Sequence, residues 1–172
     1  CVICTKMIIN AGITRVVIKE SYPDELAQQL PLVKKLLTGL GIKILECEGF
    51  EADDILGTVS EIFSKSGNEC IVLTGDRDSL QLINEKVHVR LVTNKETIEF
   101  DEKLFVEKYG FEPIHLIDLK ALMGDSSDNI SGVSGIGEKT ATTLIQKFKT
   151  VEALYNSIDE AELTNSVKNT LI

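Results

Sequence analysis

The sequence predicts an α/β fold in which a parallel sheet is followed by an all-helical module. Two short, apolar, β-branched segments, 42–46 (IKILE) and 70–74 (CIVLT), are typical of buried strands in a parallel sheet. Between them, apolar residues from Ile55 to Phe63 recur at helical spacing and make one apolar face. Strand, helix and strand in this order predict a βαβ unit with a right-handed crossover.

The elements around this unit are marked by apolar spacing and by end signals. A helix face from Leu32 to Leu37 ends near Gly39 and Gly41, and a strand is possible at Arg15–Ile18. Segment 87–92 alternates as a strand does, and 97–100 predicts a further strand at an edge.

The pattern becomes helical after the last expected strand. Asp101 can cap a helix that runs through Tyr109, and Pro113 suits the first turn of a helix that ends near Met123. Two more helices are predicted at 138–148 and 151–157. The α/β body is therefore expected to give way to a helical module near Leu122.

Composition limits the class of protein. The chain has 172 residues with 43% hydrophobic and 26% charged residues, as globular domains do. It has no apolar run of about 18 residues and no signal-peptide pattern. Cys47 and Cys70 lie in apolar stretches, which predicts buried free thiols and a cytoplasmic location with no membrane partner.

The net charge of −9 argues by itself against nucleic-acid binding. The distribution of charge is more informative, because the segment from Lys120 to Thr150 contains four lysines and three acidic residues. An acidic body with a mildly basic tail fits an enzyme that binds metal ions in one place and phosphates in another.

The acidic residues that could form a functional site make three groups along the sequence. Glu51, Asp53 and Asp54 open the helix of the βαβ unit. Asp76 and Asp78 directly follow the strand at 70–74, where open α/β sheets bind ligands. The third group is formed by Asp125 and Asp128.

Each acidic group also has an ordinary explanation, since acids complement a helix dipole, suit turns and cap helices. Together, however, seven carboxylates in one crevice would repel one another unless cations bound there. Oxygen ligands favour Mg²⁺ or Mn²⁺, and two such ions about 4 Å apart can hydrolyse a phosphodiester. The sequence therefore predicts a two-metal site, and neither His88 nor His115 lies in the acidic groups.

A glycine-rich segment, 132–137, precedes the helix expected at 138–148. Glycines let backbone N–H groups approach an anion, and Lys139 in the first turn can add a phosphate contact. This predicts a grip on the DNA backbone without base reading. The alternative is a tight turn between helices.

These motifs, in this order, resemble the 5′-nuclease domain of bacterial DNA polymerase I, in the flap endonuclease superfamily. The segments that carry the resemblance are EGFEADDI (48–55), TGDRDSLQL (74–82), DLKALMGDSSDNI (118–130) and GVSGIGEKTA (132–141). The resemblance implies a PIN-like body at 29–121, lacking its N-terminal strands, and a helix-hairpin-helix-type module at 122–172.

The resemblance also implies roles for particular residues. Two divalent ions would be bound by Glu51, Asp53, Asp54, Asp76, Asp78, Asp125 and Asp128, of which Asp54, Asp76 and Asp78 are assigned to catalysis. Duplex DNA, often with a K⁺ ion at the hairpin, would be held by Arg77, Gly132, Gly135, Ile136, Gly137, Lys139 and Thr140. A polymerase domain is a possible partner in the parent protein.

The N-terminus departs from the nuclease pattern, because the expected strands with metal-binding Asp residues are not found there. Residues 1–28 instead resemble a fragment of deoxycytidylate deaminase, with Cys1 and Cys4 as half of a zinc motif. The upstream H-x-E segment that completes such a site is lacking, so bound Zn²⁺ is not expected.

These observations leave three hypotheses. The first is a 5′-3′ exonuclease and flap endonuclease of DNA replication and repair. The second is a catalytically impaired remnant of that domain that still binds DNA. The third is a relic of a zinc-binding deaminase.

Overall fold

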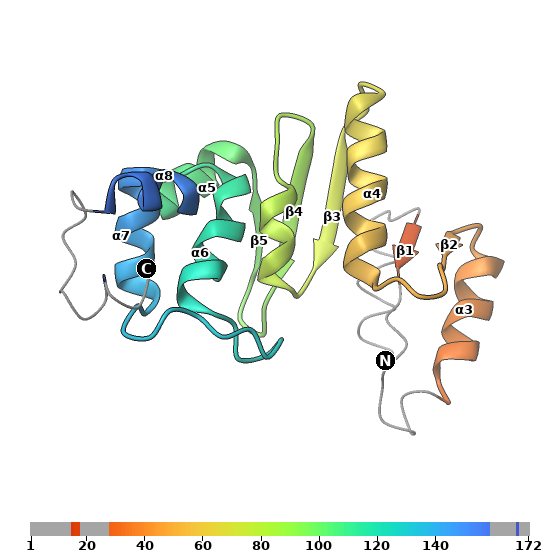
Figure 1. The fold of residues 1–172 in the computed structure, drawn as a ribbon. Helices are drawn as coiled ribbons and strands as arrows, with labels where there is room; N and C mark the ends of the chain where they lie inside the picture. The colour runs from red at the N-terminus through yellow and green to blue at the C-terminus, as the bar shows by residue number, and fades with distance from the viewer. Residues whose placement is uncertain (1–14, 18–27, 159–167, 169–172) are drawn as a thin grey trace. The chain divides into compact units, whose positions relative to one another are not determined.

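The computed structural model describes residues 15–17, 28–158 and 168 of the chain (Figure 1). The chain divides into two compact units, Cys1–Ile62 and Phe63–Ile172. The prediction that the body ends at residue 121 remains a prediction.

The first unit is built around a pair of parallel strands. It contains β1 (Arg15–Val17), α3 (Leu30–Gly39), β2 (Lys43–Leu45) and most of α4 (Ala52–Lys65). β1 and β2 pair with Arg15 opposite Lys43, and α3 connects them in sequence. The strand expected near Arg15 and the helix ending near Gly39 are both confirmed.

The predicted βαβ unit between 42–46 and 70–74 is wrong, although both segments are strands. β2 pairs with β1, whereas β3 (Cys70–Thr74) pairs with β4 (Val87–Val92), so the described strands β2 and β3 belong to different sheets. Apolar, β-branched composition favours a strand but does not identify its partner, which tertiary contacts decide.

The second unit contains a mixed sheet in the order β3-β4-β5, with β5 at Thr97–Phe100. β3 and β4 are parallel, and their connection passes through the 3₁₀ helix η1 (Arg77–Leu82). β4 and β5 are antiparallel, with Val89 opposite Phe100. The predicted alternation is confirmed, because Val87, Val89 and Leu91 of β4 are buried and the residues between them are only partly so.

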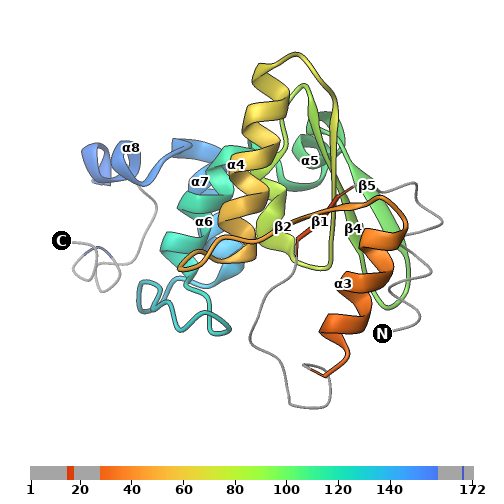
Figure 2. The ribbon, with the colours of Figure 1, turned by 90° about the vertical axis from the view of Figure 1, so that its right-hand side faces the viewer.

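Every described element after β5 is helical, as expected. These elements are α5 (Glu102–Tyr109), η2 (Pro113–His115), α6 (Leu116–Met123), α7 (Glu138–Phe148) and α8 (Val151–Asn156). Figures 1 and 2 show α6 and α7 side by side, and α8 packs against both.

Caps and cross-links fix the ends of these helices. Asp101 Oδ1 accepts a hydrogen bond from the Leu104 N–H at 2.7 Å, so the expected cap of α5 is confirmed. Asp118 Oδ1 of α6 accepts from the Val151 N–H at 2.9 Å, which ties α6 to the first turn of α8.

The core of the second unit joins the sheet to the helices. Phe105 stacks on Tyr109 at a centroid distance of 4.4 Å and meets the edge of Phe111 at 5.8 Å. The other buried apolar side chains that line the helical part are Leu116, Leu119, Leu122, Ile136, Ala141, Leu144, Ile145 and Leu154.

The cysteine prediction is wrong in one respect. Cys47 and Cys70 are free, but Cys47 is exposed and Cys70 only half-buried. Cys47 follows the short strand β2 instead of lying within it, so the apolar segment does not cover it. Among the described residues, none of the helices has the length and apolarity needed to cross a membrane.

Lys149 adopts an unusual backbone conformation between α7 and α8. Its φ is 69° and its ψ is −56°, and the Thr150 N–H bonds to the Phe148 carbonyl at 2.9 Å, which defines a γ-turn with positive φ. Such strain costs about 1–3 kcal/mol. We expect Lys149→Gly to raise the free energy of unfolding by about 1 kcal/mol, since glycine's entropy loss of about 0.5–1 kcal/mol offsets only part of the relief.

Urea unfolding measures this change, with Lys147→Gly as the matched control. Lys147 lies inside α7, so that variant should lose about 1 kcal/mol. A Lys149→Gly variant that is less stable than the parent would show that the backbone at Lys149 is not strained.

Candidate metal centre

The turn after β3 presents Asp78. Asp76 caps η1, because its Oδ1 accepts a hydrogen bond from the Asp78 N–H at 2.9 Å. The Asp76 N–H in turn donates to Thr74 Oγ1 at 3.0 Å. Asp76 is exposed and holds the turn, whereas Asp78 is partly buried. This local structure follows from the sequence, since an Asp two residues before an N–H donor favours an Asx-turn.

A closed loop after α6 presents Asp125 and Asp128. Asp125 and Ile130 exchange both backbone hydrogen bonds, at 2.9 and 2.8 Å, so the residues between them form a tight loop. Asn129 takes the left-handed conformation with φ 57°, which Asn tolerates better than most residues. The loop is short and hydrogen-bonded, and so its acidic side chains are held in place.

Two glycines close the base of this loop. Gly124 has a φ of 77°, and a Cβ on it would lie 2.4 Å from the Gly132 nitrogen. A Cβ on Gly132 would lie 2.3 Å from the Met123 carbonyl carbon. The two backbones approach so closely that neither position has room for a side chain.

These elements bring three carboxylates together. Oxygen atoms of Asp78, Asp125 and Asp128 all lie within 4.8 Å of one another. Asp78 and Asp125 are partly buried, and Asp128 is exposed. Three carboxylate oxygens at this separation form a donor set that suits a hard divalent cation such as Mg²⁺ or Mn²⁺.

Lys120 belongs to this cluster and was missed by sequence reasoning. Its Nζ donates to Asp78 Oδ1 at 2.7 Å and also to Asp125 Oδ2. The only signal is a lysine in the last turn of a helix, which usually complements the helix dipole and does not indicate a site.

The charges of Lys120 and Asp125 stabilise each other. The Lys120 ammonium, with the hydroxyl and N–H of Ser127, lowers the pKa of Asp125 well below its usual range. Partial burial acts against the charged form of Lys120, but hydrogen bonds and charge from Asp125 and Asp78 outweigh it and raise the pKa of Lys120. Both groups are therefore charged at neutral pH.

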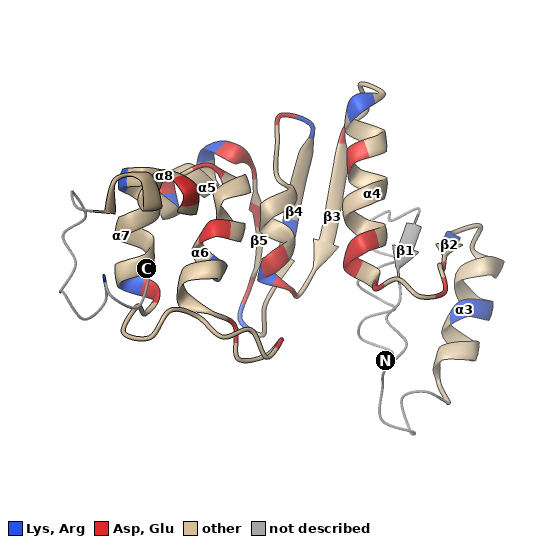
Figure 3. Ribbon diagram, in the orientation of Figure 1, with Lys and Arg blue, Asp and Glu red and all other residues tan. Residues whose placement is uncertain are grey.

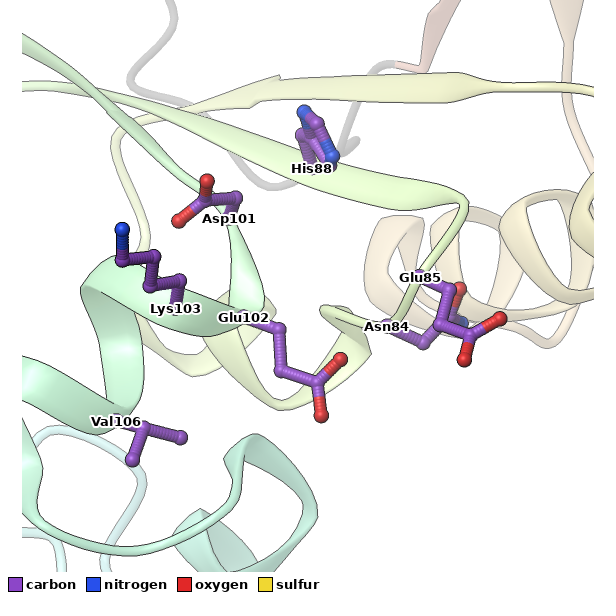
Figure 4. Close-up of a pocket in the computed structure, with 7 residues that line it drawn as sticks. All are labelled: Asn84, Glu85, His88, Asp101, Glu102, Lys103 and Val106. Carbon is purple, nitrogen blue, oxygen red and sulfur yellow. The ribbon is translucent and has the colours of Figure 1, made fainter.

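Asp78, Asp125 and Lys120 line a hollow of about 370 Å³ that also contains Ile117 and Ile130. A larger hollow of about 480 Å³ lies elsewhere in the second unit. In Figure 4 its acidic side chains, Glu85, Asp101 and Glu102, point in different directions, so they do not form a ligand set. The smaller hollow is the better candidate because its charged groups converge.

Of the other four predicted metal ligands, Asp76 lies in the second unit and three lie in the first unit. Glu51, Asp53 and Asp54 occupy the start of α4, and all three are exposed. Asp54 Oδ2 accepts from the Glu51 N–H at 2.9 Å, as in a capping box. The described structure thus brings together three of the seven predicted carboxylates, and the inclusion of the other four in one site remains a prediction.

The predicted DNA-binding residues other than Arg77 lie at or just before the start of α7. Gly135 has a φ of 86°, and the Ile136 N–H bonds to the Val133 carbonyl at 3.0 Å, so the hairpin is a turn that depends on glycine. Lys139 and Thr140 are exposed in the first turn of α7, and Arg77 is exposed in η1. Figure 3 shows acidic and basic colour together at this end of α7, where Glu138 precedes Lys139, and acidic residues in the loop after α6.

Ile136 departs from the role expected of a surface contact. Its side chain is buried, with 4% exposed, so only its backbone could reach a nucleic acid. The two interpretations of Gly132, Gly135 and Gly137 therefore do not exclude each other: the segment can form a tight interhelical turn and also contact DNA through its backbone. DNA and K⁺ binding at this hairpin remain predictions.

Two family models together cover the described fold. The model of the 5′-3′ exonuclease N-terminal resolvase-like domain matches residues 15–110, and the model of the 5′-3′ exonuclease C-terminal SAM fold matches residues 111–172. The chain belongs to the 5′-3′ exonuclease family. The predicted α/β body with a helical module is confirmed by this match.

The similar proteins of known sequence include DNA polymerase I of Bacillus subtilis. It is 46% identical over 144 residues, which is 83% of this chain and 16% of that protein. A protein named 5′-3′ exonuclease from Buchnera aphidicola is 40% identical over 142 residues, 83% of this chain and 49% of that protein. The chain thus spans about a sixth of the polymerases that it resembles.

Solved structures support the fold. The T5 5′-exonuclease with bound zinc has a TM-score of 0.74 at 19% identity, covering 99% of this chain and 73% of that one. The catalytic core of Rad2 in complex with DNA has a TM-score of 0.62 at 17% identity, covering 96% and 57%. At these identities the likeness shows the fold alone.

The deaminase resemblance at residues 1–28 gains no support. The exonuclease match already begins at residue 15, and none of the relatives named above is a deaminase. Cys1 and Cys4, the proposed zinc residues, lie outside the described residues.

Proposed function

We propose that this chain hydrolyses DNA phosphodiesters at 5′ ends and flaps, with divalent cations bound by its carboxylates, in the cytoplasm. The observation that carries the proposal is the convergence of Asp78, Asp125 and Asp128 within 4.8 Å in a member of the 5′-3′ exonuclease family. Structures of the T5 exonuclease with divalent metal ions and DNA, and of Rad2 with a DNA substrate, agree with it.

The chain's own residues supply the positions for this chemistry. Asp78 and Asp125 offer partly buried carboxylate oxygens, and Asp128 offers an exposed one towards solvent. Asp76 orients Asp78 through the bond to its N–H, and Ser127 orients Asp125. Divalent cations, when bound, activate a water and stabilise the charge on the phosphodiester oxygens.

The hairpin before α7 would hold the DNA backbone. Glycine-rich backbone at the start of an 11-residue helix provides N–H groups and a positive dipole end, and Lys139 adds a charge. Such contacts are independent of sequence and weaken as salt rises. The partner would be duplex DNA next to a 5′ end, and a polymerase domain would be part of the parent protein.

The test is cleavage of a 5′-flap DNA by the purified chain at enzyme excess. We expect products with Mg²⁺ or Mn²⁺ and none with EDTA, because three carboxylates without cations cannot stabilise the phosphodiester. Cleavage that persists in EDTA would contradict the metal role. A folded chain that binds the flap DNA but never cuts it would be the impaired remnant instead.

A further inference from the structure

The acidic cluster already contains a cation of the chain's own. The Lys120 ammonium contacts Asp78 and Asp125, which are two of the three carboxylates that converge. Asp125 is further engaged, since its Oδ1 accepts from the Ser127 N–H at 2.8 Å and from the Ser127 hydroxyl. Asp128 is left as the exposed carboxylate of the three.

In the metal-free protein, this arrangement reduces the repulsion among the three carboxylates. Three carboxylates within a few Å repel one another, and one ammonium between two of them removes much of that repulsion. The side chains of Lys120 and Asp125 are 26% and 11% exposed, so water screens this pair only in part.

The same contact places the ammonium where a divalent cation would bind. A metal ion bound between Asp78 and Asp125 would compete with Lys120 for the two oxygen atoms that now accept its hydrogen bonds, Asp78 Oδ1 and Asp125 Oδ2. An ammonium and a metal ion also repel each other at this range. Lysine has a flexible four-carbon stem, so it can leave without any movement of the backbone.

We propose that Lys120 is a resident counter-ion that divalent metal must displace, so that it sets the metal concentration at which the centre fills. The proposal rests on the proposed function, since it concerns the same carboxylates. It assigns Lys120 two effects of opposite sign, which are stabilisation of the metal-free chain and weakening of metal binding. A lysine that only closed a surface ion pair would have the first effect and not the second.

Calorimetric titration with Mn²⁺ alone, without DNA, separates these possibilities. The variants are Lys120→Met, which keeps the length without the charge, and Lys120→Arg, which keeps the charge. Lys103→Met is the matched control, because Lys103 is an exposed lysine of α5 in the same unit and outside the cluster. We expect Lys120→Met to bind Mn²⁺ about tenfold more tightly, and Lys120→Arg and Lys103→Met to bind as the parent does.

Thermal unfolding gives the second readout. Without metal, Lys120→Met should melt below the parent, and added Mn²⁺ should raise its melting temperature more than it raises the parent's. Unchanged or weaker Mn²⁺ binding by folded Lys120→Met would overturn the counter-ion role and leave the metal centre standing. Absence of Mn²⁺ binding in the parent and in every variant would overturn both.

The unmodified chain provides a measurement that does not depend on variants. Mn²⁺ should raise the rate at which an amine-reactive reagent labels Lys120, because displacement exposes the amine, while labelling of Lys103 stays constant. If metal binds and Lys120 labelling does not rise, the displacement does not occur and the proposal fails.

Discussion

Asp125→Asn should reduce the rate of 5′-flap cleavage by about 10³-fold or more while the chain stays folded. The carboxylate supplies both a ligand oxygen and a negative charge to the centre, and the amide supplies neither in full. The loop should survive the change, because an amide oxygen can still accept from the Ser127 N–H that now bonds to Oδ1 at 2.8 Å. Single-turnover cleavage at enzyme excess measures the effect.

The matched control for this experiment is Glu107→Gln on α5. Glu107 is an exposed acid of the same unit, so its removal changes the net charge equally without touching the centre. Asp76→Ala is a less informative variant, since Asp76 caps η1 and its loss would disturb the turn that presents Asp78. Cleavage by Asp125→Asn at the parental rate would remove Asp125 from the chemistry.

Local patterns in the sequence predicted most of the elements, for a physical reason. The alternation of β4 and the cap of α5 depend on neighbouring residues, so spacing and end signals suffice to find them. The pairing of β2 with β1 instead of β3 depends on contacts between distant segments. Periodicity contains no information about such partners.

The residues of the candidate centre were likewise predicted only in part from the sequence. Asp78 follows a strand and Asp125 follows a helix, and both positions were predicted from sequence motifs. Lys120 was not, because its role depends on the path of the loop that brings Asp125 back towards the end of α6. A lysine five residues before an aspartate has no local signature, and only the three-dimensional structure shows that its ammonium reaches both acids.

The loop that carries Asp125 and Asp128 should depend on Gly132 more than on any of its acidic residues. Gly132→Ala would place a Cβ 2.3 Å from the Met123 carbonyl carbon and 2.4 Å from the Gly124 nitrogen. Both of these are backbone atoms, which cannot turn aside as a flexible side chain does. We expect the loop to open, with a loss of about 1–3 kcal/mol in the free energy of unfolding.

Metal affinity distinguishes this effect from a general loss of stability. Opening the loop separates Asp125 from Asp78, so Mn²⁺ binding to Gly132→Ala should weaken by about tenfold or more under conditions where the chain is folded. Gly39→Ala is the control, because a Cβ at that position meets nothing within 4 Å. That variant should keep the parental Mn²⁺ affinity. If Gly132→Ala also binds Mn²⁺ as the parent does, the close approach of Gly124 and Gly132 does not hold the carboxylates together, and their convergence must be maintained by Lys120 and Ser127 instead.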